Sequence, residues 1–263
     1  MCREILSRAF TPWFTTGVCL KACCLALVVP IGSLTAGQQV PAYEELEGVR
    51  DGGVVHGVVR FVGEPPPAKT VPVTKNPEVC GEGDRLIGEV KVSDGALQNV
   101  VVYLEGVEAG KGWSIPDDGV LLDQQECRFT PQVVVLPKGE PLVIQNSDPV
   151  LHNIHARETF GRVHRTIFNL AQPDQGSRLT QRVRPRRSNL VELECDAHEF
   201  MHAWMLVVAN PYYAKVDQAG AFSIAEVPPG TYLVKAWHPT LGTQEQEVTI
   251  APNGTMEVAF TFP

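Results

Sequence analysis

Hydrophobic and polar residues alternate in short runs along most of the chain after residue 50. Each run is rich in Val, Ile, Thr and aromatic residues and is bounded by Gly, Pro, Asn or Asp, which is typical of β-strands. No 12-residue window after residue 37 has the 3.6-residue apolar period of a helix. The pattern therefore predicts an all-β protein built of β-sandwiches. The expected strands are 54–63, 96–106, 131–148, 188–195, 204–210, 231–238, 243–251 and 255–262.

The beginning of the chain has a different pattern. A basic start, the apolar run 22–31 and the small residues after it are typical of a secretory signal peptide that ends near Gly37. The run is shorter than the roughly 20 apolar residues that span a bilayer, so cleavage is favoured over a permanent membrane anchor. We expect residues 1–37 to be a signal peptide and residues 38–49 a linker, in a protein that is periplasmic or secreted.

Composition and charge exclude several classes. Apolar residues make up 44% and charged residues 20%, which excludes intrinsic disorder. The formal net charge of −8 becomes about −10 without the signal segment and argues against nucleic-acid binding. Four of the seven cysteines lie in that segment, which leaves Cys80, Cys127 and Cys195. An odd number of cysteines in an exported protein requires an explanation.

The last 50 residues contain an Asp–x–x–Gly turn, a Phe-bearing strand and a Pro–Pro–Gly–Thr–Tyr motif. We expect Gly220 and Gly230 to supply the positive φ of tight hairpins. This pattern resembles the carboxypeptidase regulatory-like (transthyretin-like) β-sandwich. The resemblance covers too few strands for the whole sandwich.

Residues 54–63 and 97–105 resemble the missing opening strands of the same family. We therefore expect a split sandwich of residues 50–107 plus 210–263, with residues 108–209 as an inserted domain. A single enlarged sandwich is the alternative.

The inserted range contains a set of soft donors. Alternation along 188–195 turns Cys195 inward, and the spacing Cys195-x-x-His198-x-x-Met201 lets one tight turn bring three side chains together. His152 follows another expected strand and would supply a fourth donor. Thiolate, two imidazoles and a thioether form the set that selects copper, with a trigonal His₂Cys group and a weak axial Met.

At these residues the chain resembles a cupredoxin, a blue (type 1) copper domain with a Greek-key sandwich, in its amicyanin and plastocyanin motifs. The motif NSDPVLHNIHA indicates His152 rather than His155 as the first ligand. The resemblance implies that Asn153 hydrogen-bonds to the cysteine loop and that an edge of His198 faces solvent. The chain departs from the family in the 42 residues, rich in arginine, between His152 and Cys195.

Other histidines and cysteines leave alternatives open. His155 could replace an equatorial ligand, His202 could be axial, and His238 could lie near the site. With Cys195 as a metal thiolate, we expect Cys80 and Cys127 to form a disulfide; two separate buried thiols are the alternative.

Residues 157–187 contain eight arginines against two acidic residues. This segment is either a solvated loop or edge strand that discourages aggregation, or a docking patch for an acidic redox partner. It lacks the interleaved aromatic residues of a nucleic-acid site.

The resemblance implies a protein that is not an enzyme, has no catalytic residues and holds one type 1 copper. It would pass single electrons between redox partners such as a cytochrome or a dehydrogenase. We expect contact with a membrane only through an uncleaved signal segment. The alternatives are a copper carrier or storage protein, and an extracellular carbohydrate-binding or adhesion module with an incidental metal.

Overall fold

The computed structural model describes residues 42–263, which lie in one compact unit. The expected signal peptide and the first part of the expected linker lie outside the described residues. Within them, the single helix α1 (Pro77–Cys80) is one turn long and strands form nearly all the remaining regular structure, so the all-β prediction is confirmed. None of the described helical structure has the length and apolarity needed to cross a membrane.

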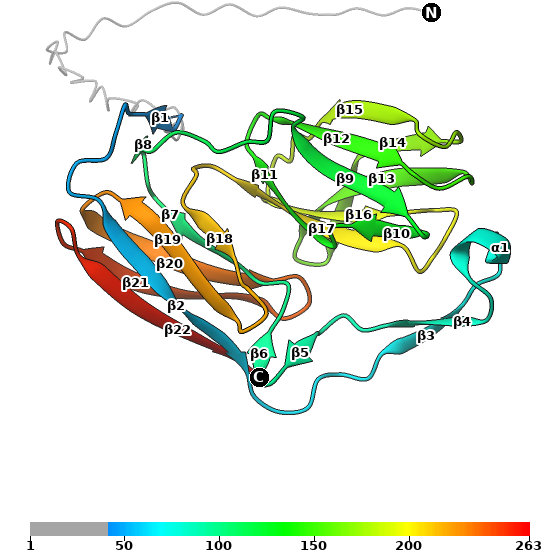
Figure 1. Cartoon of the computed structure of the whole chain (residues 1–263), viewed down its shortest axis with the longest axis horizontal. Coiled ribbons are helices and arrows are strands. Elements are labelled where there is room, and N and C mark those ends of the chain that lie inside the picture. Colours follow the sequence, from blue (N-terminus) through cyan, green and yellow to red (C-terminus); the bar gives the residue numbers. More distant parts are fainter. Residues whose placement is uncertain (1–41) are drawn as a thin grey trace, which may run out of the picture. The chain divides into compact units, whose positions relative to one another are not determined.

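The central sandwich, as we call residues 120–208, consists of two sheets that enclose a hydrophobic cluster (Figure 1, green to yellow). The alternation expected for 188–195 is present, because Val191 and Leu193 are fully buried and Cys195 is 3% exposed. One sheet has the order β10 (Arg128–Thr130), β9 (Val120–Gln125), β12 (Pro141–Asn146), β15 (Arg178–Arg182), and the other β11 (Val133–Pro137), β17 (His202–Val208), β16 (Leu190–Glu194), β13 (His152–Phe160), β14 (Val163–Gln172).

The terminal sandwich, as we call residues 53–61, 92–105 and 213–262, surrounds a second hydrophobic cluster. The cluster joins segments from both sides of the central sandwich in sequence. One sheet has the order β18 (Tyr213–Lys215), β7 (Val101–Glu105), β20 (Gly230–His238), β21 (Gly242–Ile250); the other has β19 (Ala221–Val227), β2 (Gly53–Phe61), β6 (Ala96–Leu97), β5 (Val92–Ser93), with β22 (Thr255–Phe262) parallel to β2.

Two local expectations need correction. Gly220 has a φ of +75°, but Gly230 does not have the positive φ that we expected. Gly230 lies against the Tyr232 ring, whose hydroxyl would be 2.7 Å from an added Cβ, so close approach is what favours glycine there. The expected linker also contains a short strand, β1 (Glu44–Glu45), which pairs in parallel with β8 (Ala109–Gly110).

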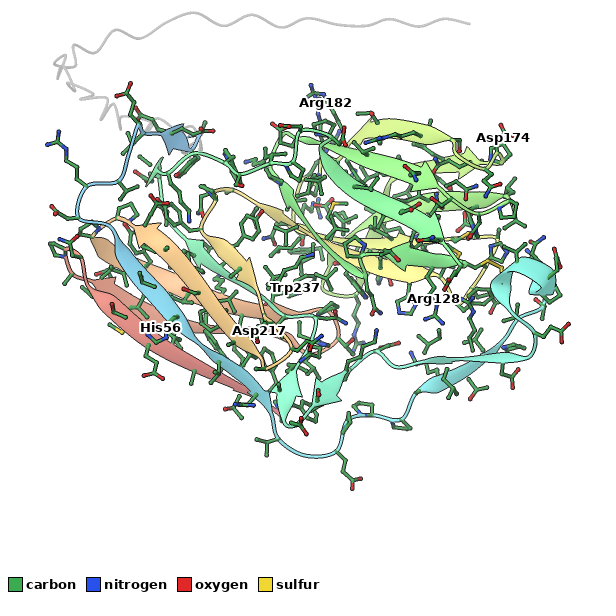
Figure 2. All side chains as sticks on the ribbon, in the orientation of Figure 1. His56, Arg128, Asp174, Arg182, Asp217 and Trp237 are labelled. Atoms are coloured by element: carbon green, nitrogen blue, oxygen red, sulfur yellow. A yellow bond between two sulfur atoms is a disulfide. The ribbon has the colours of Figure 1, made fainter. Side chains whose placement is uncertain are left out.

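A third, smaller cluster joins strands of the two sandwiches. Trp237 of β20 is 2% exposed and packs with Val133 and Leu206 of the central sandwich (Figure 2). Lys215 also donates a hydrogen bond to the Val133 carbonyl over 2.6 Å. The two sandwiches are therefore in direct contact.

The segment between β2 and β5 leaves the terminal sandwich (Figure 1, cyan). Its antiparallel strands β3 (Lys69–Pro72) and β4 (Asp84–Ile87) flank α1, and we call residues 69–87 the arm. Four apolar residues of the arm pack against the central cluster, and Cys80 is disulfide-bonded to Cys127. The expected disulfide is thus present and ties the arm to the central sandwich.

Candidate metal centre

Neighbouring strands bring the expected ligands together. His152 begins β13 and Cys195 follows β16, and these two strands pair antiparallel with His155 opposite Glu194. The end of β16 therefore lies beside the start of β13. The connection from β16 to β17 then carries His198 and Met201.

Backbone hydrogen bonds fold this connection into a tight loop. The His198 amide donates to the Cys195 carbonyl over 3.2 Å, and the Met201 amide donates to the His198 carbonyl over 2.9 Å. The Cys195 amide closes the loop by donating to the Met201 carbonyl over 3.2 Å. All three side chains are buried in or beside the central cluster, with Met201 1% exposed.

Three donor atoms converge on one buried point. His152 Nδ1 and His198 Nδ1 are 3.1 Å apart, and Cys195 Sγ lies 3.9 Å and 3.7 Å from them. Donor atoms bound at about 2.0–2.3 Å around one ion in a trigonal arrangement lie roughly 3.5–3.9 Å apart. The two distances to Cys195 Sγ match this spacing, and the Nδ1–Nδ1 distance of 3.1 Å is shorter. The three donor atoms are therefore close enough together to hold a single metal ion.

The second ring nitrogen of each histidine has its own partner. His152 Nε2 lies 2.8 Å from Asp148 Oδ2, and His198 Nε2 lies 3.2 Å from Asn76 Oδ1. Both partners are acceptors, so each Nε2 carries the proton and each Nδ1 presents a lone pair. Two imidazole lone pairs thus face each other beside the Cys195 sulfur, an arrangement that a cation would stabilise.

Burial sets the protonation of two of these groups. It raises the pKa of the Cys195 thiol, against hydrogen bonds that lower it. Burial and the neighbouring His152 lower the pKa of His198 to about 4. His198 is therefore neutral near pH 7, and Cys195 needs a positive charge nearby to become a thiolate.

Asn153 makes the contact that the sequence predicted. Its Oδ1 lies 3.4 Å from Cys195 Sγ and accepts a hydrogen bond from the Ala197 amide over 3.3 Å. Its Nδ2 donates to Asn169 and to Asp196. These bonds connect β13 to the cysteine loop across the site.

One expectation about the site is wrong. We expected an edge of His198 to face solvent, but His198 is 2% exposed. Its ring lies against Phe200, with ring centroids 5.6 Å apart, and its Nε2 is covered by Asn76 of the arm. The arm precedes the ligand loop by more than 100 residues, so nothing near the loop indicated this cover.

Asp148 and Asn76 were missed as residues of the site. Asp148 is 5% exposed and binds both His152 and the backbone amides of Glu126 and Cys127. Its position four residues before His152 was the available signal. Asn76 had none, because its contact depends on the path of the arm.

The alternative histidines have other surroundings. In the described part of the chain, His152, Cys195 and His198 belong to clusters of donor atoms that lie within 4.8 Å of one another. These clusters do not include His155, His202 or His238. His155 binds Asp196 and Thr166, and His238 lies in the terminal sandwich. His202 lines a cavity next to the site.

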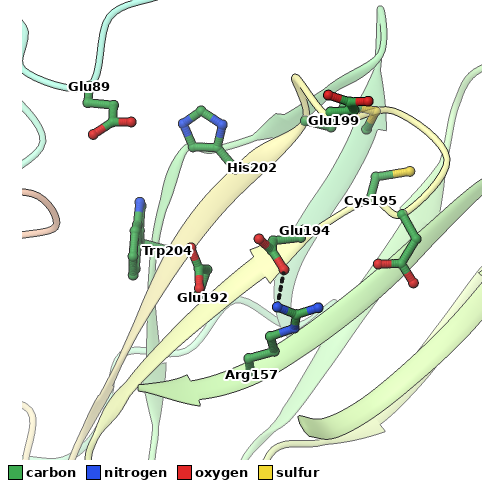
Figure 3. Close-up of a pocket in the computed structure, with 10 residues that line it drawn as sticks. Glu89, Arg157, Glu192, Glu194, Cys195, Glu199, His202 and Trp204 are labelled. Carbon is green, nitrogen blue, oxygen red and sulfur yellow. Dashed lines mark ion pairs between the residues drawn. The ribbon is translucent and has the colours of Figure 1, made fainter. Parts of the chain in front are cut away.

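That cavity has a volume of about 380 Å³, and Cys195 and Met201 are among its lining residues (Figure 3). Its other lining residues are mostly acidic. Two of the lining residues, Arg157 and Glu194, form an ion pair over 3.2 Å. The cavity is lined by Glu89, Arg157, Glu192, Glu194, Cys195, Asp196, Glu199, Met201, His202 and Trp204.

The arginine-rich segment forms two edge strands. β14 is the outermost strand of one central sheet and β15 is the outermost strand of the other. Arg165 pairs with buried Glu158, whereas Arg162 is exposed at a hairpin turn. The structure therefore agrees with the interpretation of this segment as edge strands. Its use as a docking patch stays a prediction.

Comparison with known families and curated proteins gives one partial match. The profile of polysaccharide lyase family 4, domain II, matches residues 202–258. The match runs from the start of β17 into β22 and covers 57 of the 263 residues, too few to establish a family. No curated protein matches the chain.

Two solved structures are similar to part of the chain. A purple cupredoxin from Nitrosopumilus maritimus is 16% identical with a TM-score of 0.29, over 34% of this chain and 99% of that chain. A copper-containing nitrite reductase (NirK) from Thermus scotoductus SA-01 is 17% identical with a TM-score of 0.28, over 41% of this chain and 25% of that chain. Both TM-scores are low, so neither likeness bears on the function of this chain.

Proposed function

We propose that this protein is an exported type 1 copper protein that transfers single electrons between redox partners. One observation carries the proposal: the Nδ1 atoms of His152 and His198 and the Sγ of Cys195 converge within 3.9 Å of one another in a buried site. Met201 ends the same loop and is also buried.

The donor set supports copper over other metals. A trigonal His₂Cys group with a weak axial thioether is the ligand set of electron-transfer copper sites, and copper exceeds zinc in intrinsic affinity for nitrogen and sulfur donors. His152, Cys195, His198 and Met201 would hold the ion. The ion would supply the change between Cu(I) and Cu(II).

The chain itself supplies rigidity and the exclusion of water. Asp148 holds the orientation and tautomer of His152, because a carboxylate that accepts the outer N–H of a ligand histidine orients the ring. Asn153 keeps the cysteine loop against β13. A ligand geometry that changes little between oxidation states lowers the cost of moving an electron.

The proposal also includes the domain organisation, the export and the partners of the protein. We propose that residues 108–209 are a cupredoxin domain inserted into a carboxypeptidase regulatory-like sandwich formed by residues 50–107 and 210–263. The signal segment would export it to the periplasm or beyond. The partners would be redox proteins such as a cytochrome or a dehydrogenase, and the protein would not itself be an enzyme.

The test is the visible spectrum of the copper-loaded protein. We expect an intense thiolate-to-copper band that Cys195→Ser abolishes, because serine cannot supply the sulfur. His164→Asn is the matched control, since His164 is an exposed histidine paired with Glu192 outside the site, and the band should persist. Absence of the band from the unmodified protein, or its survival in Cys195→Ser, would contradict the type 1 assignment.

Voltammetry then separates electron transfer from copper storage. Reversible cycling of the bound copper at an electrode supports electron transfer, whereas rapid metal exchange without reversible cycling supports a carrier.

The profile match to a polysaccharide lyase domain favours glycan binding as a second candidate function for the terminal sandwich. Glycan binding that persists in Cys195→Ser would support it.

A further inference from the structure

His198 is closed off from solvent by a segment that is remote in sequence. Its Nε2 lies 3.2 Å from Oδ1 of Asn76, which precedes α1 at the tip of the arm. Asn76 has a φ of 51° and a ψ of 46°, a left-handed conformation that asparagine tolerates better than most residues. The Asn76 amide nitrogen lies 3.4 Å from Glu78 Oε1, which agrees with its oxygen facing the imidazole.

Several contacts hold the arm over this edge. Four residues after Asn76, Cys80 is bonded to Cys127 of the central sandwich. The Arg85 guanidinium donates to the carbonyls of Cys127 and Glu126 over 2.7 Å and 2.6 Å. It also lies 4.6 Å above the ring of Phe200, the same ring that packs against His198. The arm is thus joined to the central sandwich by covalent, polar and apolar contacts.

The same disulfide adjoins the partner of the other histidine. The amides of Glu126 and Cys127 donate to the Asp148 carboxylate over 2.8 Å and 2.7 Å, and this carboxylate binds His152 Nε2. The outer nitrogens of both imidazoles are therefore held by side chains that lie next to one disulfide. Asp148 is a charged acceptor within the central sandwich, and Asn76 is a neutral acceptor from the arm.

We infer that the arm is a cap of the metal centre and that Asn76 is a positioning residue for His198. The Asn76 oxygen keeps the proton on Nε2, so the Nδ1 lone pair stays directed at the metal. The cap also covers the imidazole edge, so a large redox partner meets the arm rather than His198. This inference rests on the proposed copper function.

Copper release is the first readout. In Asn76→Ala, the rate at which a chelator extracts copper should rise, because loss of a partner of this kind typically lowers metal affinity by about 10-fold or more. Asn76→Asp keeps an acceptor oxygen and should restore much of the retention. Glu82→Ala is the matched control, since Glu82 is an exposed residue of the same arm.

Chemical modification of His198 in the copper-free protein is the second readout. Diethyl pyrocarbonate acylates accessible imidazole nitrogens, and mass spectrometry locates the product. We expect His198 to be protected in the unmodified protein and in Glu82→Ala, and to react faster in Asn76→Ala. Reduction of Cys80–Cys127 with a phosphine should increase the reaction further by freeing the arm.

These outcomes separate the two hypotheses. A protein that lacks the thiolate-to-copper band but shows protection relieved by Asn76→Ala contradicts the proposed function and supports the cap. A protein with the band, in which Asn76→Ala matches Glu82→Ala in both copper extraction and acylation, overturns the cap and leaves the copper function intact. Asn76→Ala decides the inference even if reduction of the disulfide unfolds the protein.

Discussion

The two sandwiches differ most in what they bury. In the part of the chain that the structure describes, ten polar or charged residues are buried, and eight of them lie between Gln124 and His198, inside the central sandwich. The terminal sandwich is filled almost entirely by aliphatic and aromatic side chains, such as Leu104, Trp237 and Phe260. Its buried polar residue His238, and Asn210 in the connection that leads into it, are the other two.

Burying a polar group lowers stability unless hydrogen bonds compensate, so a stable sandwich has no need for eight of them. In the central sandwich these groups bind one another or the backbone: Asn146 donates to the carbonyls of Val150 and Gln172, and Gln124 donates to the Gln172 side chain. The terminal sandwich shows that the chain can form a stable core without such groups. Their concentration around His152 and His198 indicates where function constrains the core.

The largest expected effect comes from shortening one buried leucine in each of the two cores. Leu104→Ala in β7 and Leu193→Ala in β16 each remove a buried side chain, so each should lower the free energy of unfolding by about 2–5 kcal/mol. Only Leu193→Ala, two residues from Cys195, should also speed copper loss. Urea denaturation and chelator kinetics measure the two effects, and equal copper loss in both variants would contradict the separation.

A buried charge of the central sandwich should give the next largest effect. Glu158 is 2% exposed and accepts hydrogen bonds from the amides of Arg186 and Ser188 and from the Arg165 side chain. Burial raises the pKa of Glu158, but hydrogen bonds from the backbone and from Arg165 outweigh it and lower this pKa to about 2. Glu158→Gln should lower the free energy of unfolding at pH 7 by about 1.5–3 kcal/mol.

The stabilisation that Glu158 provides should decrease at low pH. Because the folded pKa of Glu158 is below its ordinary value of 4.5, its stabilisation is present above pH 4.5 and is lost as the pH falls towards 2. The difference in unfolding free energy between the unmodified protein and Glu158→Gln should shrink over that window. Glu257→Gln, at an exposed position of β22, is the control and should show no such change.

At pH 7 His238 should give the smallest effect, because it is neutral there in the folded protein, and it tests the exception in the terminal sandwich. Its Nδ1 accepts hydrogen bonds from the Thr240 and Leu241 amides, its Nε2 has no partner, and burial lowers its pKa to about 4. The unfolded chain takes up a proton below about pH 6.5, so stability should fall between pH 6.5 and 4, by at most about 1.4 kcal/mol per pH unit.

His238→Asn keeps an acceptor oxygen and cannot titrate, so it should flatten this part of the curve. His56→Asn, on the partly exposed face of β2, is the control. An unchanged pH profile in His238→Asn would show that the buried ring does not contribute to the acid sensitivity. Thermal or urea unfolding across pH 4–7 measures it.

Local pattern was sufficient for much of the fold and for the centre of the site. The runs of β-branched residues predicted β2, β16, β20 and β22 to within a few residues, because each strand has its own alternation and turn residues. The spacing from Cys195 to Met201 also works locally, since a single loop with three internal hydrogen bonds brings these residues together. The hairpin of β13 and β14 was not among the expected strands, and the sequence left a solvated loop and an edge strand open for most of it.

The parts of the site that could not be predicted depend on segments far apart in the chain. Alternation in the sequence determined the all-β class and the inward direction of Cys195. The spacing of the donor residues, together with the family resemblance, indicated the candidate ligand set. The tertiary structure decided that the arm crosses to the central sandwich, that Asn76 and Asp148 hold the two imidazoles, and that His198 is buried. Side-chain direction repeats every two residues along a strand, whereas a contact such as that between Asn76 and His198 has no period and forms only when distant segments pack together.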